Sequence, residues 1–566
     1  MPRPERPAEP PRRWLGPLRL LLLSSTLLIP LLLMKGKSAT FDEVAHLPAG
    51  YSYLTTGLVK INPQHPPLIK EICAVPLLFL DAKMPVDPET LRRSPVSLIY
   101  QWGFGKRFLY SQDADRLLFW GRVPAVLLSV GLATLVMLWA SRLWGGAAGL
   151  FALFLYAFDP TVTAHAQLVT TDVGLAFFAT LFLYLLRRYL AAPSWGRLTA
   201  SGLGLGLALG AKFSGAALVP MAVLLIGMAA WRGRQDESAR TGTKGRASGN
   251  KGEARSRPTI LNPLEGNDRS ARILSAAGAL AVLVVLAAAV LWTIYFFPAD
   301  PLFYLRGMET VNRDHSPDYL PYLMGAMRPG GWKSYLLVAW LVKTPIPSLI
   351  LLLAAGVLFL RGRRSGWLDE AFLVIPALGF FVGYSLTADN LGVRYLIPCF
   401  PFFFIFTARI IPALRESRIW AKGAVVLLLF WYLGEFAAVT PDHLSYFNEI
   451  AGGSRNGLLW LDDSNLDWGQ GLIQLQAYLR EHPIREYRFC YFGSGEPGYY
   501  GIRGQPINVS ALTSPPPPGI LILSAHCVAR ARAEMALLHG EGAANWLAHA
   551  VPKAVVGHAY YVYEFR

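Results

Sequence analysis

Long apolar runs constrain this chain most, because each is long enough to cross a lipid bilayer as a helix. A spanning helix needs about 20 apolar residues, and on that criterion we expect about eleven spans. The candidate spans are centred near residues 24, 128, 152, 181, 204, 222, 285, 348, 377, 403 and 429. Backbone polar groups in lipid must be paired within the protein, so this pattern predicts a polytopic α-helical membrane protein.

The composition excludes a large soluble enzyme. Of the 566 residues, 53% are hydrophobic and only 16% are charged. A net charge of +16 in a soluble chain would indicate nucleic acid or an anionic surface as partner. Here the basic residues fall mainly between the apolar runs, so the charge reports membrane orientation, and we expect no nucleic-acid partner.

Basic residues gather at every second connection between the apolar runs, as expected of cytoplasmic segments. The clusters comprise Arg3, Arg6, Arg12 and Arg13 in the N-terminal tail, then Arg142, residues 187–197, residues 232–272, "RGRR" at 361–364, and Arg415, Arg418 and Lys422. An odd number of spans then places the loop at 34–116 and the C-terminal residues 440–566 on the outer side. We therefore expect a cytoplasmic tail (1–13), a transmembrane domain (14–439) and an outer domain (440–566).

Three segments leave alternatives open. Residues 14–34 resemble a signal peptide, but the apolar run is long and ends in "MKGK" without a small-x-small cleavage site, which favours a first span. Residues 199–231 form either one long helix or two helices broken near "GAKFSG". Residues 232–272 are rich in Gly, Ser and Arg, which predicts a disordered cytoplasmic linker, with contact to anionic lipid as the alternative.

The residues after 440 change in character. "EYRFCYFG", "GILILSAHCV" and "AVVGHAYYVYEF" favour strands, and residues 469–481 and 529–540 favour helices, so we expect a small α/β domain on the outer face. The four cysteines, at 73, 399, 490 and 527, are too few for a disulfide scaffold and lack zinc-site spacing. Cys490 and Cys527 would form either a disulfide in an oxidising outer compartment or remain buried thiols.

Ionisable residues at membrane depth or at its edge are costly and are usually retained for function. The candidates on the predicted outer side are Asp42, Glu43, His65, Lys70, Asp172, Lys212, His315, Lys343 and Arg394. A carboxylate base beside cations that bind phosphate suits the transfer of a group from a membrane-anchored phosphate to a hydroxyl. A lipid-linked substrate would explain why such a site lies at the membrane edge.

The first outer loop carries the motifs with a family resemblance. "FDEVAH" followed by "HPPLIK" resembles the loop of protein O-mannosyltransferases, and is similar to that of bacterial aminoarabinose transferases; both belong to the GT-C superfamily. "LVTTD", "GLALGAKFSG", "LVKTP" and "GVRYLIPCFPFF" extend the resemblance over most of residues 40–410. "SYFNEIAGG" and "DDSNLDWGQGL" resemble the C-terminal part of bacterial phospholipid-carrier-dependent glycosyltransferases.

The resemblance implies a mechanism and roles for particular residues. It implies Asp42 as catalytic base, Glu43 as the group that orients it or the acceptor, and Asp172 as a second acidic group that shapes the pocket. It also implies a carrier-phosphate or sugar side formed by His65, Lys70, Lys212 and Arg394. The sugar would move from a polyprenyl-phosphate carrier to a glycan, lipid or protein acceptor in a single displacement with inversion, with no obligatory metal or other cofactor. The expected location is the bacterial plasma membrane, with the site facing the periplasm or exterior.

The chain also departs from these families. It lacks the large soluble insertion of eukaryotic O-mannosyltransferases, and His65 stands where aminoarabinose transferases have the lysine of Lys-Pro-Pro. The acceptor and the sugar therefore stay open. A transporter or flippase of lipid-linked sugars, or a noncatalytic envelope-assembly scaffold, are the alternative functions, although a transporter favours ionisable residues near midplane.

Structural roles are the alternative for each candidate residue. Asp42, Glu43 and Asp172 would cap helices, and Lys212 and Arg394 would extend from span ends toward water. Lys70 would pair with Glu71 or Asp81, or extend toward water from an interfacial helix at 68–80. In "DDSNLDWGQG" the alternating acidic residues resemble a calcium loop, but Trp468 stands where that loop requires glycine. A divalent cation is thus unsupported, and a helix cap or an acceptor-docking loop is favoured there.

Overall fold

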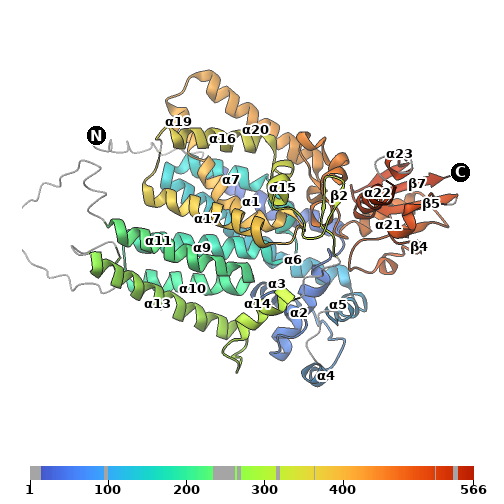
Figure 1. Ribbon diagram of the computed structural model, residues 1–566, viewed down its shortest axis with the longest axis horizontal. Helices are drawn as coiled ribbons and strands as arrows, with labels where there is room; N and C mark the ends of the chain where they lie inside the picture. Colours follow the sequence, from blue (N-terminus) through green and yellow to red (C-terminus); the bar gives the residue numbers. More distant parts are fainter. Residues whose placement is uncertain are drawn as a thin grey trace, which may run out of the picture.

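The computed structural model describes residues 15–94, 100–233, 262–263, 269–313, 319–362, 364–516, 518–539 and 546–565. The predicted tail at 1–13 and His315 lie outside the described residues, as does most of the predicted linker at 232–272. The described chain forms a bundle of long helices with a small sheet domain at one end (Figure 1). This is the predicted fold class.

Within the described residues, eight helical segments are long and apolar enough to span a membrane. They comprise α1 (Leu15–Leu33, continued to Gly36), α6 (Ala114–Trp144), α9 (Thr171–Ala191), α11 (Leu218–Arg232, preceded by the 3₁₀ turn η3, Phe213–Ala217), α13 (Arg269–Ile294), α17 (Trp367–Thr387), the run Val393–Arg415 that contains η4 (Val393–Cys399), α18 (Phe400–Thr407) and α19 (Ile410–Arg415), and α20 (Ile419–Val439). Two bent pairs raise the number to ten. They are α7 (Gly146–Ala157) with α8 (Pro160–Ala166), and α15 (Tyr335–Lys343) with α16 (Ile346–Leu360).

The predicted count of eleven spans is not confirmed. The remaining predicted segment, near residue 204, is α10 (Trp195–Ala211), a helix of 17 residues that is shorter than a full span. It lies between α9 and α13 (Figure 1). Gly202 and Gly206 allow this packing, because a Cβ there would come within 2.7 Å of Leu286 and 2.6 Å of Val290.

The stretch 199–231 is two helices. Helix α10 ends at Ala211, Lys212 adopts an extended backbone with φ −158° and ψ 143°, and η3 and α11 follow. This break places Lys212 at the end of the bundle that carries the sheet domain.

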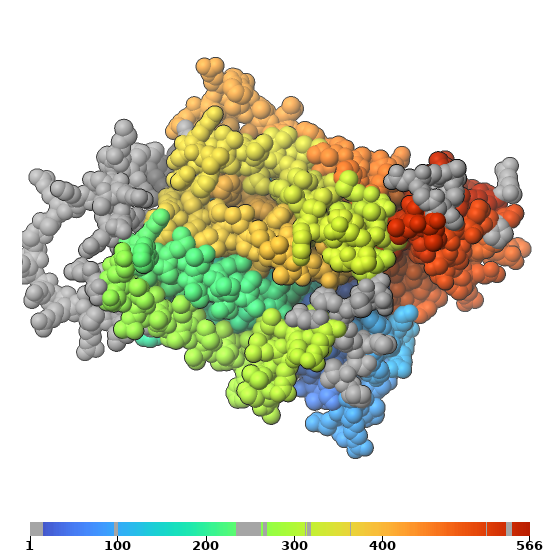
Figure 2. Space-filling model, in the orientation of Figure 1, coloured from blue at the N-terminus to red at the C-terminus, as the bar shows by residue number. Residues whose placement is uncertain are grey.

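The first outer loop is helical and packs on that same end of the bundle. It contains α2 (Glu43–Thr56), α3 (Leu68–Ala74), η2 (Val75–Phe79), α4 (Pro88–Arg93) and α5 (Tyr100–Tyr110). Between α13 and α15 the chain adds α14 (Phe303–Arg313) and a hairpin of β1 (Tyr322–Leu323) and β2 (Ala326–Met327). Figure 2 shows the first outer loop in blue beside the C-terminal domain in red and orange.

The C-terminal domain contains a mixed five-stranded sheet in the order β4-β3-β5-β7-β6. Strands β4 (Gln505–Pro506), β3 (Arg488–Cys490) and β5 (Gly519–Ser524) are parallel, while β7 (Tyr560–Phe565) is antiparallel to β5 and to β6 (Ala554–Val556). Helices α21 (Leu472–Glu481), α22 (Ala525–His539) and α23 (Trp546–His549) accompany the sheet, and the 3₁₀ turns η5 (His443–Ser445), η6 (Glu449–Ala451), η7 (Ser454–Leu459) and η8 (Asp463–Asn465) join it to the bundle. Central residues such as Ile522 and Val562, which pair across β5 and β7, are buried.

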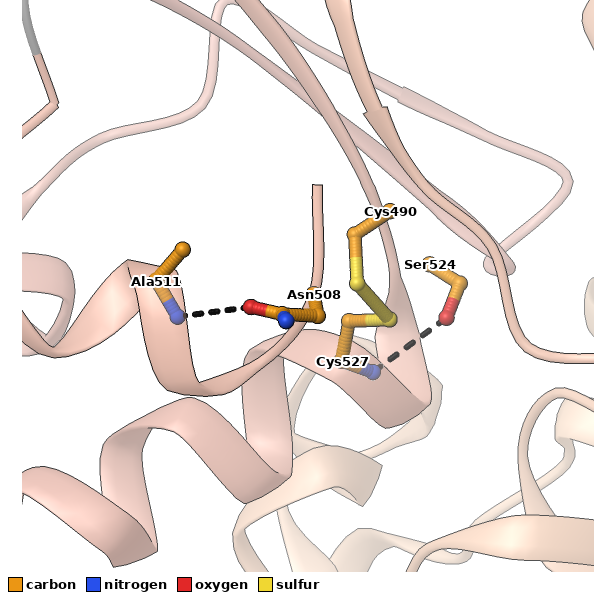
Figure 3. Close-up of a disulfide and its surroundings, with 5 residues drawn as sticks. All are labelled: Cys490, Asn508, Ala511, Ser524 and Cys527. Atoms are coloured by element: carbon orange, nitrogen blue, oxygen red, sulfur yellow. Dashed lines mark hydrogen bonds between the residues drawn. A yellow bond between two sulfur atoms is a disulfide. The ribbon is translucent and has the colours of Figure 1, made fainter. Parts of the chain in front are cut away.

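Cys490 and Cys527 form a disulfide, which was one of the two alternatives for this pair (Figure 3). Cys490 ends β3, and Cys527 lies in the first turn of α22, where its amide donates to the Ser524 hydroxyl at 3.2 Å. The bond therefore joins the carboxyl end of one parallel strand to the helix that follows its neighbour.

Candidate active site

A cavity of about 600 Å³ lies where the bundle, the first outer loop and the C-terminal domain meet. Its lining is drawn from four parts of the chain. The first loop contributes Phe41, Asp42, His46, Asn62, Gln64, His65 and Trp102; residues 311–330 contribute Val311, Tyr319, Pro321 and Gly330; residues 388–395 contribute Ala388, Asp389, Asn390, Leu391, Arg394 and Tyr395; the C-terminal region contributes Asp463, Trp468 and Phe492.

Asp42 occupies the N-cap position of α2, but within the described chain its carboxylate makes no capping hydrogen bond. Instead its Oδ2 accepts a hydrogen bond from Nη1 of Arg394 at 2.7 Å, and its side chain is 19% exposed. The capping alternative for Asp42 is therefore not what the structure describes. The carboxylate faces the cavity beside a guanidinium.

Four of the predicted site residues form a chain of alternating charge. Arg394 pairs with Asp42, and the same Nη1 lies 3.8 Å from Oδ2 of Asp172. Lys212 donates to Oδ1 of Asp172 at 2.6 Å, and its ammonium lies 4.7 Å from the ring centre of Tyr395. Asp172 lies in the first turn of α9 and Arg394 in η4, so the ends of separate spans bring these charges together.

Glu43 lies behind the cavity wall and is fully buried. Its two carboxylate oxygens accept hydrogen bonds from Nε and Nη2 of Arg122 at 2.8 and 2.7 Å, and also from the amides of Thr40 and Val169. Burial would raise the pKa of Glu43, but the Arg122 guanidinium and these hydrogen bonds outweigh it and hold the pKa below its usual range. Glu43 thus anchors the loop that carries Asp42.

Arg122 is a site residue that the sequence analysis missed. It donates to the carbonyls of Met34, Lys37 and Ser38 at 2.8 to 3.1 Å, in addition to Glu43. It thereby ties the end of the first span to α6. Arg122 lies near the start of α6, where the long apolar run begins, and an arginine at the edge of a span is the signal that would have found it.

His65 lines the cavity, whereas Lys70 is buried behind the loop that carries His65. The ring centre of His65 lies 5.7 Å from that of His46. Lys70 is 1% exposed and donates to the carbonyl and side-chain oxygen of Asn62 and to the carbonyl of His65, at 2.6, 2.7 and 2.7 Å. All three ammonium protons of Lys70 thus support the loop that presents Asn62 and His65. Its predicted contact with phosphate stays a prediction.

Lys343, another candidate, lies near the end of α15 and is buried. It donates to the carbonyls of Leu444 and Asn465 at 2.8 and 2.5 Å. Lys343 therefore joins the bundle to the turns that precede the sheet domain.

The "DDSNLDWGQG" segment lies against the first outer loop and contributes to the cavity. The amide of Phe41 donates to the carbonyl of Trp468 at 2.8 Å, and the amide of Ser38 donates to the carbonyl of Gln470 at 3.1 Å. Trp468 stacks under the Arg394 guanidinium, whose Cζ lies 4.3 Å from the indole centre. The segment thus packs directly beside Asp42.

Asp463, from the same segment, is a second carboxylate in the cavity lining. Its oxygens accept hydrogen bonds from the Tyr319 hydroxyl at 3.0 Å and the Ser464 amide at 2.6 Å. Its φ of +52° is unusual for a residue other than glycine. Among the described residues, no group of three or more His, Cys, Asp or Glu side chains is placed to hold a metal ion.

One family model matches a segment of the chain that contributes to this arrangement. Residues 115–240 match the family model of dolichyl-phosphate-mannose-protein mannosyltransferases. The predicted resemblance to protein mannosyltransferases is confirmed for this segment, which contains Arg122 and Asp172 of the site. No curated protein matches the chain.

Solved structures with a similar overall course include ArnT and an archaeal oligosaccharyltransferase. ArnT from Cupriavidus metallidurans in the apo state has 13% sequence identity and a TM-score of 0.48, over 97% of this chain and 98% of that one. A structure of the same protein bound to undecaprenyl phosphate has 12% identity and the same TM-score, over 98% of each chain. The archaeal oligosaccharyltransferase AglB from Archaeoglobus fulgidus, in complex with an inhibitory peptide and a dolichol-phosphate, has 12% identity and a TM-score of 0.43, over 92% of this chain and 72% of that one.

His46 predicts a pH-dependent stability. Burial lowers the pKa of His46 from 6.5 to about 4, although the nearby Asp42 carboxylate opposes the shift. Between these values the unfolded chain binds a proton that the folded chain does not, so stability is lost as the pH falls from about 6.5 to 4, by up to about 3 kcal/mol. Thermal unfolding of His46→Asn is expected to depend less on pH in this window than that of the wild type. His482→Asn, at an exposed histidine, is the control and should keep the wild-type pH dependence.

Proposed function

We propose that this protein is a glycosyltransferase that moves a sugar from a polyprenyl-phosphate carrier to a hydroxyl acceptor at the outer face of the plasma membrane of a bacterium. One observation carries the proposal. A carboxylate, Asp42, and a guanidinium, Arg394, face the same cavity at one end of the helical bundle, 2.7 Å apart. The match of residues 115–240 to a mannosyltransferase family supports the same reaction class.

The proposed reaction is a single displacement with inversion at the anomeric carbon. Asp42 accepts the proton of the acceptor hydroxyl, whose oxygen forms the new bond to the anomeric carbon. The bond from that carbon to the carrier phosphate breaks, and the phosphate oxygen keeps the electron pair. Arg394, supported by Asp172 and Lys212, stabilises the negative charge on the departing polyprenyl phosphate.

The ion pair between Asp42 and Arg394 gives the donor a second role. In the free protein the Arg394 guanidinium donates a hydrogen bond to Oδ2 of the Asp42 carboxylate, so this oxygen is already occupied. A donor phosphate competes for the same guanidinium, because Arg binds phosphate oxygens strongly. Donor binding thus frees Asp42 for the acceptor hydroxyl, so we expect the donor to bind before the acceptor reacts.

A transfer assay tests this function. Membranes that contain the wild-type protein are incubated with polyprenyl phosphate carrying a labelled hexose or pentose, and the label is followed into lipid, glycan and protein fractions. Movement of label that depends on the protein is the expected result. Label that crosses the membrane but stays on its carrier would indicate a transporter, and label that neither moves nor crosses would favour a scaffold.

Arg394→Gln is expected to raise the KM for the lipid-linked donor at least about tenfold, because a charge-assisted hydrogen bond to phosphate is lost. The measurement is the dependence of the initial transfer rate on donor concentration. Arg328→Gln is the matched control, since Arg328 lies in the same outer region but donates to the carbonyl of Gly331 rather than facing Asp42. An unchanged donor KM in Arg394→Gln would remove Arg394 from the phosphate side of the cavity.

A further inference from the structure

Two parts of the cavity lining differ in chemistry. The part formed by span ends is charged, because Arg394 lies there with Asp172 and Lys212 behind it. Another part of the lining is aromatic. Phe41, Trp102 and Phe492 form it, and we term it the aromatic wall. The charged part suits the carrier phosphate, so the aromatic wall is left for the other substrate.

The aromatic wall is assembled from three separate segments. Phe41 directly precedes Asp42, Trp102 lies in α5, and Phe492 lies just beyond the carboxyl end of β3. The ring of Phe41 contacts Trp102 edge-on, with centres 4.8 Å apart at 74°, and Phe492 in a stacked arrangement, with centres 5.6 Å apart at 29°. Each of the three side chains is half-buried, so each keeps surface toward the cavity.

The C-terminal domain holds Phe492 firmly. The His526 ring stacks on Phe492 with ring centres 3.6 Å apart at 14°. The Cys490–Cys527 disulfide fixes the same two segments, since Cys490 lies two residues before Phe492 and Cys527 follows His526 (Figure 3). A preorganised ring of this kind costs little entropy when a ligand binds to it. The position of the Phe492 ring is therefore fixed before any ligand binds.

Polar side chains also line the cavity. The lining includes the amides of Asn62 and Gln64 and the carboxylate of Asp463. Among the described lining residues, three carry carboxylates, Asp42, Asp389 and Asp463, against one guanidinium, Arg394. A further phosphate on the acceptor would meet this excess of negative charge, whereas hydroxyl groups donate readily to carboxylate and amide oxygens.

We propose that the acceptor is a saccharide, which lays one face of a sugar ring against the aromatic wall and presents a hydroxyl to Asp42. This inference rests on the proposed function. A general base must lie within hydrogen-bond reach of the proton that it removes, so the acceptor's body must lie beside Phe41, the neighbour of Asp42. One face of a sugar ring exposes C–H groups that pack on aromatic rings, and its rim carries hydroxyls that can hydrogen-bond to Gln64 and Asp463, which also line the cavity.

An acceptor panel tests the inference. Full-length protein in lipid vesicles, supplied with labelled polyprenyl-phosphate sugar, is offered alkyl hexosides and pentosides, a peptide rich in Ser and Thr, and an anionic phospholipid with a free hydroxyl. Label on an alkyl glycoside is expected. Label on the peptide or the phospholipid alone overturns the saccharide acceptor and leaves the transferase proposal standing. If the label stays on the carrier both in these vesicles and in native membranes, the saccharide acceptor and the transferase function are both overturned.

Phe492→Leu tests the aromatic wall itself. The KM for the alkyl glycoside is expected to rise about three- to tenfold, with the donor KM unchanged, and Phe492→Tyr is expected to restore the wild-type value because it keeps the ring. Phe430→Leu, at a 69% exposed position on α20, is the matched control. An unchanged acceptor KM in Phe492→Leu, or an equal change in the donor KM, would overturn the role of the wall. A failure of Phe492→Tyr to restore the acceptor KM would do so as well.

Discussion

Replacing Asp42 by asparagine is expected to lower the rate of sugar transfer by about 10²- to 10⁴-fold, the usual contribution of a general base. Asparagine has nearly the same size as aspartate but does not accept a proton at neutral pH. The protein is expected to remain folded, because the Asp42 side chain is 19% exposed and its partner Arg394 retains Asp172 at 3.8 Å. The loss should therefore fall on kcat, while the donor still binds.

The measurement compares initial transfer rates of wild type and Asp42→Asn, with donor binding and thermal unfolding recorded on the same preparations. Asp87→Asn is the matched control, because Asp87 lies in the same outer loop at the exposed N-cap of α4, and asparagine caps a helix equally well. Asp42→Asn with near wild-type kcat would exclude Asp42 as the base. An unfolded Asp42→Asn protein would instead make Asp42 a structural residue.

The charged residues that the ends of the spans contribute to the candidate site could be predicted from the sequence. Asp42, Asp172 and Arg394 each lie at the end of an apolar run, and the alternating loop charge predicts that those ends share one side of the membrane. Ionisable residues in such places are rare enough to be noticed singly. Lys212 also lies within an apolar stretch, residues 199–231. The sequence leaves open whether that stretch is one helix or two helices broken near Lys212. The structure brings all four into one chain of contacts.

The residues that the C-terminal domain contributes to the cavity could not be predicted in this way. Phe492 and Asp463 reach the cavity only because the C-terminal domain docks on the first outer loop, through backbone hydrogen bonds such as that from Phe41 to Trp468. Local patterns contain no information about this docking. The composition of "DDSNLDWGQG" predicts either a helix cap or an acceptor-docking loop. It does not indicate that this segment packs against the first outer loop.

The number of membrane spans could not be predicted from the sequence either. Residues 146–166 and 335–360 are each long and apolar enough to span a membrane only as a bent pair of helices, with bends of 68° and 111°. Both breaks lie at proline, before Pro160 and at Pro345, which removes a backbone donor and disfavours a continuous helix. Proline marks where a helix breaks, but does not determine whether the two halves still cross the membrane. The fold class was predictable, and the count was not.

Glu43→Gln is expected to destabilise the folded protein by about 3–5 kcal/mol, because it leaves the Arg122 guanidinium buried without its counter-charge. The side chains of Glu43 and Arg122 are 0% and 1% exposed. Thermal unfolding of the purified protein in detergent measures the effect, and Glu89→Gln is the control, since its partner Arg93 is 79% exposed. The double variant Glu43→Gln/Arg122→Met should be more stable than Glu43→Gln alone, because it removes the uncompensated charge. Glu43→Gln with wild-type stability but no transfer would contradict the positioning role and would make Glu43 a group that contacts substrate.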